Sequence, residues 1–415
     1  MFEDILPASL RELAPQIACI LYNFVENHLY ASQWRMLYKW NIYREEPYLA
    51  EKDLGYRRVQ CTGRGSYIIS LPKEWVEDIG LNRGSEIAFN IQPDSTLTLV
   101  PRKIMEKEGR DDASKPKEYF VNVDTKEPPQ STLRMVRALY AIGADIIRIH
   151  FKNTQDASKN KNEIKNLARD NFLGSEIIDE TTDEITLQIL IKYSEFPIEK
   201  AVRRMAIVAL AANRDAIAAL KEKNTSLFDS VIHAHNDVNR LGLYIVRQLK
   251  HGIERNLYRE LGFRTPKEFL LYRIAVNDIE NIAQNAIDII KNIVSLQKLI
   301  DDETLFLKDP VDEEIYTQLL NFTRDAHILY EDVIKAMFKR DYKDAENLIS
   351  KRESFSPLES ELIMLISSKK LDPNVTSILR LIFDSSRRIM DYGRSMAELT
   401  LNRTVEEICS TLTYK

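Results

Sequence analysis

The chain has 415 residues, a length that accommodates two to four domains with hydrophobic cores of their own. Its composition, with 44% hydrophobic and 29% charged residues, 12 glycines and 14 prolines, is that of a soluble globular protein. The net charge of −5 excludes a general electrostatic attraction to nucleic acid, so any contact with DNA requires a local basic patch.

The three cysteines, Cys19, Cys61 and Cys409, lie far apart and form no Cys-x-x-Cys or Cys/His cluster. This spacing argues against a zinc site and is typical of unpaired thiols in a reducing cytoplasm. No apolar run reaches the roughly 18 residues needed to cross a bilayer, and the N-terminus lacks the pattern of a secretion signal. We therefore expect a cytoplasmic protein that is at most peripheral to a membrane.

Residues 1–55 form an N-terminal extension whose role the pattern leaves open. The stretch LRELAPQIACILYNFVENHLYASQWRMLYKW has a helical pattern, but it is dense in aromatic residues and is interrupted by Pro15. It is either an additional docking helix or a consequence of start-codon choice, with Met36 as an alternative start.

Residues 56–103 predict four short strands and one helix. Apolar residues face both sides of this small unit, so it cannot bury them alone, and we expect it to pair with a second copy in an intertwined dimer. Gly80 suits the left-handed residue that ends a helix. The expected elements are strands at RVQCT (58–62) and SYIISLP (66–72), a helix at KEWVEDIG (73–80), and strands at LNRGSEIAFNI (81–91) and TLTLVPR (96–102).

The charged segment EKEGRDDASKPKE (106–118) predicts a linker, and residues 119–195 predict a small α/β segment. Because no glycine-rich phosphate loop is present, two roles stay open for this segment: it holds a small ligand, or it only connects its neighbours. The expected elements are strands at 119–123 and 144–151, helices at 131–143 and 157–172, and two strands within 175–191.

From Pro197 onward the apolar residues recur with the period of a helix. We expect two tandem three-helix bundles, residues 197–300 and 311–405, in a chain that is multidomain and mainly α. Residues 214–232 align with residues 331–349 without a gap, which indicates a tandem duplication. The predicted buried stripe of the third helix consists of Ala275, Ile279, Ile282, Ala286, Ile289 and Ile293.

Residues 57–103 resemble the AbrB/SpoVT-type swapped-hairpin DNA-binding domains. The shared pattern is a basic pair, Gly-Arg-Gly, an apolar strand ending in Leu-Pro, a short helix ending in Ile-Gly-Leu, and Gly-Ser-Glu-Ile. The resemblance implies that this segment is half of a β-barrel, completed by the interleaved hairpins of a second chain, with basic loops on DNA. By position, the matching DNA-binding residues are Arg57, Arg58, Arg64 and Lys73.

The segment departs from that pattern in its charge. Val76 and Glu77 stand where the bacterial regulators of this type carry two arginines, and residues 57–103 hold seven Lys/Arg against five Asp/Glu. Phosphate neutralisation dominates DNA affinity, so we expect a weak, shape-driven contact. The alternative is that this domain only dimerises the protein and that its arginines are solvated.

Residues 197–405 resemble PhoU, the phosphate-uptake regulator. The resemblance rests on HNDVNRLGLYIVRQL (235–249), NDIENIAQNAIDI (277–289) and SSRRIMDYGRSMAEL (385–399). A swapped-hairpin domain, an α/β segment and two PhoU-like bundles occur in this order in the archaeal PhoU-type regulators, which the chain resembles after residue 55.

The PhoU family carries acidic helix motifs that hold iron or zinc clusters, and a spacing of four places two carboxylates on one helix face. This sequence keeps one acidic residue of each motif, Asp237, Glu280 and Asp391, and replaces the other. The replacements are Asn239, Gln284 and Arg387, in that order. Because such ions need several carboxylate ligands, we expect these residues to form hydrogen bonds and, at Arg387, a salt bridge, with no metal bound.

The six histidines and the remaining motifs offer no catalytic site. His233 and His235 lie two positions apart on a helix and point to different faces, and His235 falls on the apolar stripe, which predicts a hydrogen-bonded imidazole in the core. No nucleophile elbow, P-loop, HExxH or dinucleotide fingerprint is present. We expect neither an enzyme nor a cofactor.

These observations predict a cytoplasmic regulator of phosphate uptake and homeostasis. It would be a homodimer that binds DNA through residues 56–103, while its bundles sense or dock onto the phosphate transporter or its signalling partner. One alternative is an adaptor in which the N-terminal domain dimerises without binding DNA. Another is metal storage or sensing by the bundle carboxylates.

Overall fold

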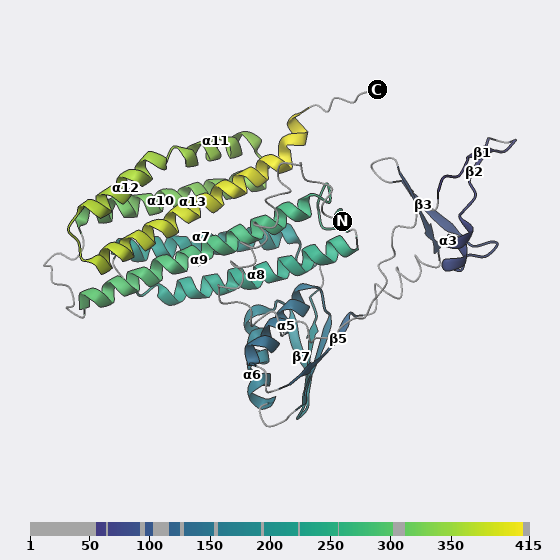
Figure 1. The fold of residues 1–415 in the computed structure, drawn as a ribbon, viewed down its shortest axis with the longest axis horizontal. Coiled ribbons are helices and arrows are strands. Elements are labelled where there is room, and N and C mark those ends of the chain that lie inside the picture. The colour runs from purple at the N-terminus through teal and green to yellow at the C-terminus, as the bar shows by residue number, and fades with distance from the viewer. Residues whose placement is uncertain are drawn as a thin grey trace, which may run out of the picture. The chain divides into compact units, whose positions relative to one another are not determined.

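The computed structural model describes residues 55–63, 65–91, 96–102, 116–124, 128–152, 157–191, 195–222, 225–255, 257–301 and 312–409 (Figure 1). The chain divides into two compact units, Met1–Lys107 and Glu108–Lys415. The helix expected within residues 1–55 and the alternative start at Met36 lie outside the described residues.

The described part of the N-terminal unit contains two β-hairpins and one short helix. Strands β1 (Gln60–Cys61) and β2 (Tyr67–Ile68) pair antiparallel, as do β3 (Ile87–Ile91) and β4 (Leu97–Pro101), with α3 (Lys73–Asp78) between the hairpins. The four strands and the helix are therefore confirmed, although β1 and β2 are only two residues long.

Helix α3 is followed by Gly80 in the left-handed conformation that the sequence predicts. Gly80 has φ of 65° and its amide donates to Glu77 O, while the amide of Leu81 donates to Val76 O. These bonds satisfy the last carbonyls of the helix, and the left-handed conformation favours glycine.

The two hairpins of this unit form separate two-stranded sheets, β1-β2 and β3-β4. No closed barrel is present among the described residues of this unit. A two-stranded hairpin has too few strands to close a sheet by itself.

The α/β segment forms one four-stranded sheet with two helices, as the sequence predicts. The strand order is β5-β6-β8-β7; β5 and β6 are parallel, and the other pairs are antiparallel. Val136, Tyr140 and Ile164 of the helices are buried against Ile147 and Leu187 of the sheet. The elements are β5 (Glu118–Val123), α5 (Pro129–Ala141), β6 (Ile146–Phe151), α6 (Ala157–Asn171), β7 (Ser175–Glu180) and β8 (Glu184–Ile189).

The α/β segment is attached to the helices through α8, against which α5 and α6 pack (Figure 1). The Arg247 side chain of α8 is buried and donates to Tyr140 O at 3.1 Å, Ala144 O at 2.6 Å and Asp145 Oδ1 at 2.8 Å. Charge-assisted bonds of this kind, shielded from water, hold the end of α5 in a fixed position on the bundle.

The described residues after the α/β segment form seven helices. The sequence predicts six; the middle helix of the second set is divided into α11 and α12, because Pro357 in a helix interior would clash with the preceding turn, whereas the first turn of a new helix accepts it. The helices are α7 (Ile198–Glu222), α8 (Phe228–Glu254), α9 (Glu268–Asp301), α10 (Glu313–Lys339), α11 (Tyr342–Glu353), α12 (Ser356–Ser368) and α13 (Pro373–Ile408).

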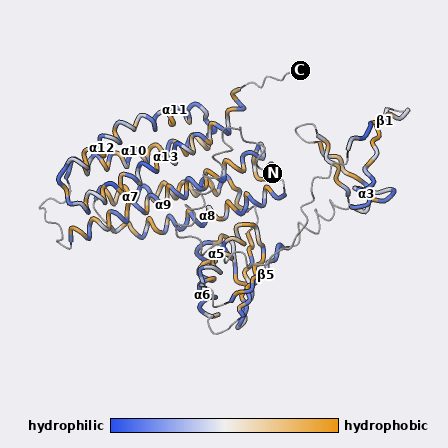
Figure 2. Tube along the Cα trace, viewed as in Figure 1, coloured by the Kyte–Doolittle hydropathy of each residue, from blue (hydrophilic) through white to orange (hydrophobic). Residues whose placement is uncertain are grey.

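Helices α7 to α13 share one hydrophobic core, so the two helix sets are joined into a single packed body. The stripe predicted on α9 is buried, from Ala275 to Ile293, and Figure 2 shows hydrophobic positions recurring along each helix. Helices α9 and α13 are antiparallel, because the start of α9 at Glu268 contacts Arg403 near the end of α13. In the described part of the chain, no helix is both long and apolar enough to span a bilayer.

Candidate functional site

Three of the four basic residues predicted to bind DNA lie at exposed positions of the N-terminal unit. Arg57 and Arg58 precede β1, and Lys73 is the first residue of α3. Arg57 Nη1 donates to Tyr56 O at 3.1 Å, and Lys73 lies 3.6 Å from Glu77 on the same helix face. No bond among the described residues joins Arg57, Arg58 and Lys73 to one another, and Arg64 lies outside those residues, so the assignment of these four residues to DNA stays a prediction.

Carboxylates in the same unit reduce its basic character. Arg102 is paired with Glu86, and Glu77 accompanies Lys73, so both cations already have a negative neighbour. Within the described part of the unit, Arg58 and Arg83 form no ion pair. Such surface pairs are weak, so their cations remain available to a phosphate at low salt.

Apolar side chains on both hairpins are exposed. In the β3-β4 hairpin, Phe89 pairs across the strands with Leu99 and Ile91 with Leu97, which places these residues on one face. The exposed fractions are 64% for Phe89, 81% for Ile91 and 53% for Leu97. The first hairpin exposes Val59, Tyr67, Ile68 and Ile69 in the same way. A described unit this poor in buried residues lacks a core of its own.

The acidic motif of α13 is occupied by arginines. Asp391 Oδ1 accepts from Nε and Nη2 of Arg352 at 3.0 and 2.7 Å, and Asp391 Oδ2 lies 3.5 Å from Arg387 Nη1. The predicted salt bridge of Arg387 is therefore confirmed, and buried Arg352 of α11 adds a second cation. Two guanidinium groups on one carboxylate leave no site for a metal ion there.

The acidic residues kept in the first helix set, Glu280 and Asp237, differ in their surroundings. Burial raises the pKa of Glu280 on α9, while Arg273 and Arg137 oppose the rise. A Cβ atom at Gly242 of α8 would lie 2.2 Å from Glu280 Oε1, so glycine is needed for this close approach. Asp237 is exposed. Across the described residues, no group of three His, Cys, Asp or Glu side chains is arranged to hold a metal ion.

His235 of α8 is half-buried, and its imidazole nitrogens lie 3.3 Å from Asn239 Nδ2. Burial lowers the pKa of His235, so the neutral imidazole is favoured. The hydrogen bond expected for His235 is confirmed, although the ring is only partly in the core. His233 is exposed, as its different helix face predicts.

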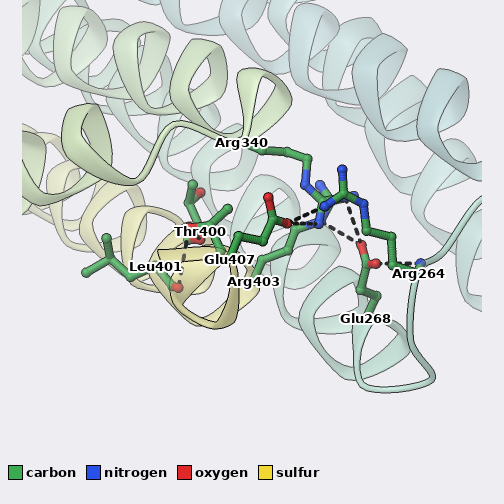
Figure 3. Close-up of polar contacts among 8 residues, drawn as sticks. Arg264, Glu268, Arg340, Thr400, Leu401, Arg403 and Glu407 are labelled. Atoms are coloured by element: carbon green, nitrogen blue, oxygen red, sulfur yellow. Dashed lines mark hydrogen bonds and ion pairs between the residues drawn. The ribbon is translucent and has the colours of Figure 1, made fainter. Parts of the chain in front are cut away.

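A network of charged residues at the ends of α9, α10 and α13 was not predicted from the sequence (Figure 3). Glu268 is buried; its Oε2 accepts from Arg403 Nε at 2.6 Å and its Oε1 from the Arg264 amide at 2.7 Å. Arg340 Nη2 donates to Glu407 at 2.9 Å and Arg340 Nη1 lies 3.9 Å from Glu268, so the network links both helix sets. Its partners are more than a hundred residues apart in places, which hides it from pattern analysis.

The buried carboxyl group of Asp278 on α9 should make the free energy of unfolding depend on pH. The carboxyl group is buried and accepts from Ser395 Oγ at 2.8 Å, and burial raises its pKa from 3.8 to about 6. Between these values the folded state keeps a proton that the unfolded state has lost, so the free energy of unfolding falls as the pH rises, by about 1–3 kcal/mol.

Replacement of Asp278 with asparagine should remove this dependence. The free energy of unfolding of Asp278→Asn, minus that of the wild type, should be larger at about pH 8 than at about pH 4. Urea denaturation of both proteins at both pH values measures this difference. The matched control is Asp237→Asn at an exposed position of α8, which should leave the difference unchanged. Equal pH profiles for Asp278→Asn and the wild type would show that Asp278 is ionised normally.

Two family models match the chain, each over less than half of its length. Residues 60–107 match the model described as "Antidote-toxin recognition MazE, bacterial antitoxin", and residues 202–293 match the PhoU domain. The chain therefore combines a MazE-like antitoxin domain with a PhoU domain, and the PhoU match falls in helices α7 to α9.

Two solved structures are similar to about half of the chain. One is the phosphate transport system regulatory protein PhoU from Streptococcus pneumoniae, with 15% identity and a TM-score of 0.42, covering 52% of this chain and 96% of that one. The other is PhoU from Pseudomonas aeruginosa, with 17% identity and a TM-score of 0.39, covering 50% and 95%. No curated protein matches the chain.

Proposed function

We propose that the chain is a regulator of phosphate uptake and homeostasis that acts as a dimeric, DNA-binding transcriptional regulator. The observation that carries the proposal is the presence of a MazE-like domain and a PhoU domain in one chain. The helical unit would sense the phosphate status or dock onto a component of the phosphate-uptake machinery, and the N-terminal unit would contact promoter DNA. We assign the chain a regulatory role and no enzymatic one.

The dimer is supported by the uncovered hairpins. Phe89, Ile91 and Leu97 are more than half exposed on one hairpin face, and burying such side chains is worth about 1.5–3 kcal/mol each. A second copy offers the same apolar faces, so pairing the two would cover both sets at once and produce a symmetric interface. The swapped arrangement of hairpins is the form that we propose for this interface.

Contact with DNA would come from the basic residues at the start of the unit. A symmetric dimer duplicates Arg57, Arg58, Arg64 and Lys73, so the local positive charge doubles even though each unit has a small net charge. With few phosphates neutralised, the affinity should depend on DNA shape and be moderate at physiological salt.

Removal of three of these cations tests the DNA contact. The Arg57→Ala/Arg58→Ala/Lys73→Ala variant should bind its own upstream DNA at least about tenfold more weakly at low salt. Because a dimer loses two copies of each cation, the slope of log K against log salt should fall by about 5. Fluorescence anisotropy of a labelled duplex measures both. The control is Arg102→Ala, which removes a cation of the same unit that is not among the four predicted DNA-binding residues and should change the affinity less.

The same variant separates the proposal from its alternative. An adaptor that only dimerises would keep its regulatory output in the triple variant, and the wild type would not bind DNA even at low salt. The small net charge of the N-terminal unit is the observation that favours this second candidate.

A further inference from the structure

A cavity of about 280 Å³ lies between α9 and α13, and its lining residues belong to none of the sites described above. Both helices contribute polar side chains to it, and exposed Leu381 forms an apolar part of its wall. Its size is near the lower limit for sites that bind small molecules. The lining residues are Asp288, Lys291 and Asn292 of α9 and Leu381, Asp384, Ser385 and Arg388 of α13.

The internal duplication shows why this cavity is unusual. When the motif Glu280–Gln284 of α9 is aligned with Arg387–Asp391 of α13, Asp278 falls on Ser385 and Asp288 falls on Ser395. The pair Ser395 and Asp278 therefore corresponds in sequence to the pair Ser385 and Asp288, and both members of the second pair line the cavity. In the first pair, Ser395 Oγ donates to Asp278 Oδ2 at 2.8 Å. The second pair lines the cavity and forms no such bond among the described residues.

Ser385 has an unpartnered hydroxyl although the residue is only 4% exposed. Its neighbour Ser386 donates to Ile382 O at 3.0 Å and contacts Thr323 Oγ1 at 2.9 Å, as a buried serine normally does. Ser385 has no hydrogen bond within the described residues and faces the cavity. Its hydroxyl oxygen is not among the unpartnered atoms that are fully shielded from solvent, so a water molecule or a ligand in the cavity can supply the missing partner.

The charges of the cavity divide into an open rim and a more enclosed part. Lys291 and Arg388 are exposed at the rim and form no ion pair within the described residues. Asp288 accepts from Gln284 Nε2 at 3.0 Å, and Asp384 lies 3.7 Å from Arg387. The amide of Asn292 donates to Asp288 O, which leaves its carbonyl oxygen as an acceptor.

We propose that this cavity binds a phosphate monoester of a hydroxyl-rich small molecule, such as a sugar phosphate or a mononucleotide. The guanidinium of Arg388 and the ammonium of Lys291 would bind the dianionic phosphate. The ligand's hydroxyl groups would donate to Asp288 and Asn292 and pair with Ser385. These two cations match a ligand with a doubly charged phosphate group better than a ligand with a single carboxylate. The oxygen acceptors of Asp288 and Asn292 match hydroxyl donors on the ligand. The site is independent of DNA binding.

Calorimetric titration of the purified full-length chain tests this site. Ribose 5-phosphate or AMP should bind saturably, with one site per chain and a Kd below about 1 mM. Ribose alone and inorganic phosphate alone should bind at least about tenfold more weakly, because each satisfies only part of the cavity. Arg388→Ala and Lys291→Ala should each weaken ester binding about tenfold, and Ser385→Ala about threefold or more.

Matched variants on the same helices serve as controls. Lys298→Ala on α9 and Arg394→Ala on α13 remove cations that do not line the cavity and should bind the ester as the wild type does. Absence of saturable binding by both esters at about 10 mM would overturn the proposal. So would equal weakening by the control variants, or inorganic phosphate binding as tightly as the esters. These outcomes are distinct from a loss of DNA binding, which this titration does not measure.

Discussion

Replacing Arg403 with methionine is expected to destabilise the helical unit by about 3–5 kcal/mol, because it leaves the buried Glu268 carboxylate without its main cation. Only the Arg264 amide and the more distant Arg340 guanidinium would then remain near that carboxylate. The helices involved belong to both sets, so the loss should weaken the joint between them. The corresponding fall in Tm is roughly 6–15 °C, measured by calorimetry or circular dichroism.

The control for this prediction is a neighbouring exposed ion pair. Lys267 lies 2.7 Å from Glu406, with side chains 75% and 65% exposed, so Lys267→Ala should change the stability by less than about 1 kcal/mol. Replacing both Glu268 and Arg403 with methionine should cost less than the sum of the single changes, because no unpaired charge remains at this pair. If Arg403→Met is as stable as Lys267→Ala, the network does not join the two helix sets.

Placing charges on the β3-β4 hairpin should abolish the dimer. Phe89 and Ile91 lie two positions apart on one face and are 64% and 81% exposed, so aspartates there are compatible with the single chain. In a paired interface the same aspartates would be buried and would face their symmetric copies. The double variant Phe89→Asp/Ile91→Asp should weaken association by at least about a thousandfold, from the lost apolar burial alone.

Light scattering after size exclusion measures the mass of this variant, and anisotropy measures its DNA binding. Both properties should be lost together if the dimer presents the basic residues. Ile253→Asp is the control, because Ile253 is 58% exposed but belongs to α8 of the other unit. A double variant that remains dimeric would place the interface elsewhere on the chain.

Local pattern was sufficient for most elements. Alternation of apolar residues predicted the strands of the α/β segment, and the stripe from Ala275 to Ile293 predicted the buried face of α9, because both depend on periods of two and 3.6 residues. The division of the middle helix at Pro357 was missed, although the proline is a local signal. The helical recurrence of apolar residues continues on both sides of this proline, so a single helix was expected there.

Contacts between distant segments could not be predicted in this way. Arg247 binds residues of the α/β segment, and Glu268 binds Arg403, across long stretches of sequence that carry no periodic signal. The sequence predicts the Arg387 partner of Asp391, but the second partner, Arg352, depends on the packing of α11 against α13. The position of Ser385 in a cavity between two helices likewise depends on how α9 and α13 pack.

The exposed hairpin faces form the basis of the account, because both the dimer and its DNA contact depend on covering them. Sedimentation velocity of the wild-type chain at about 1 μM is the most direct measurement. We predict a single species with twice the mass of one chain, which persists on further dilution. A folded single chain at that concentration would contradict the account.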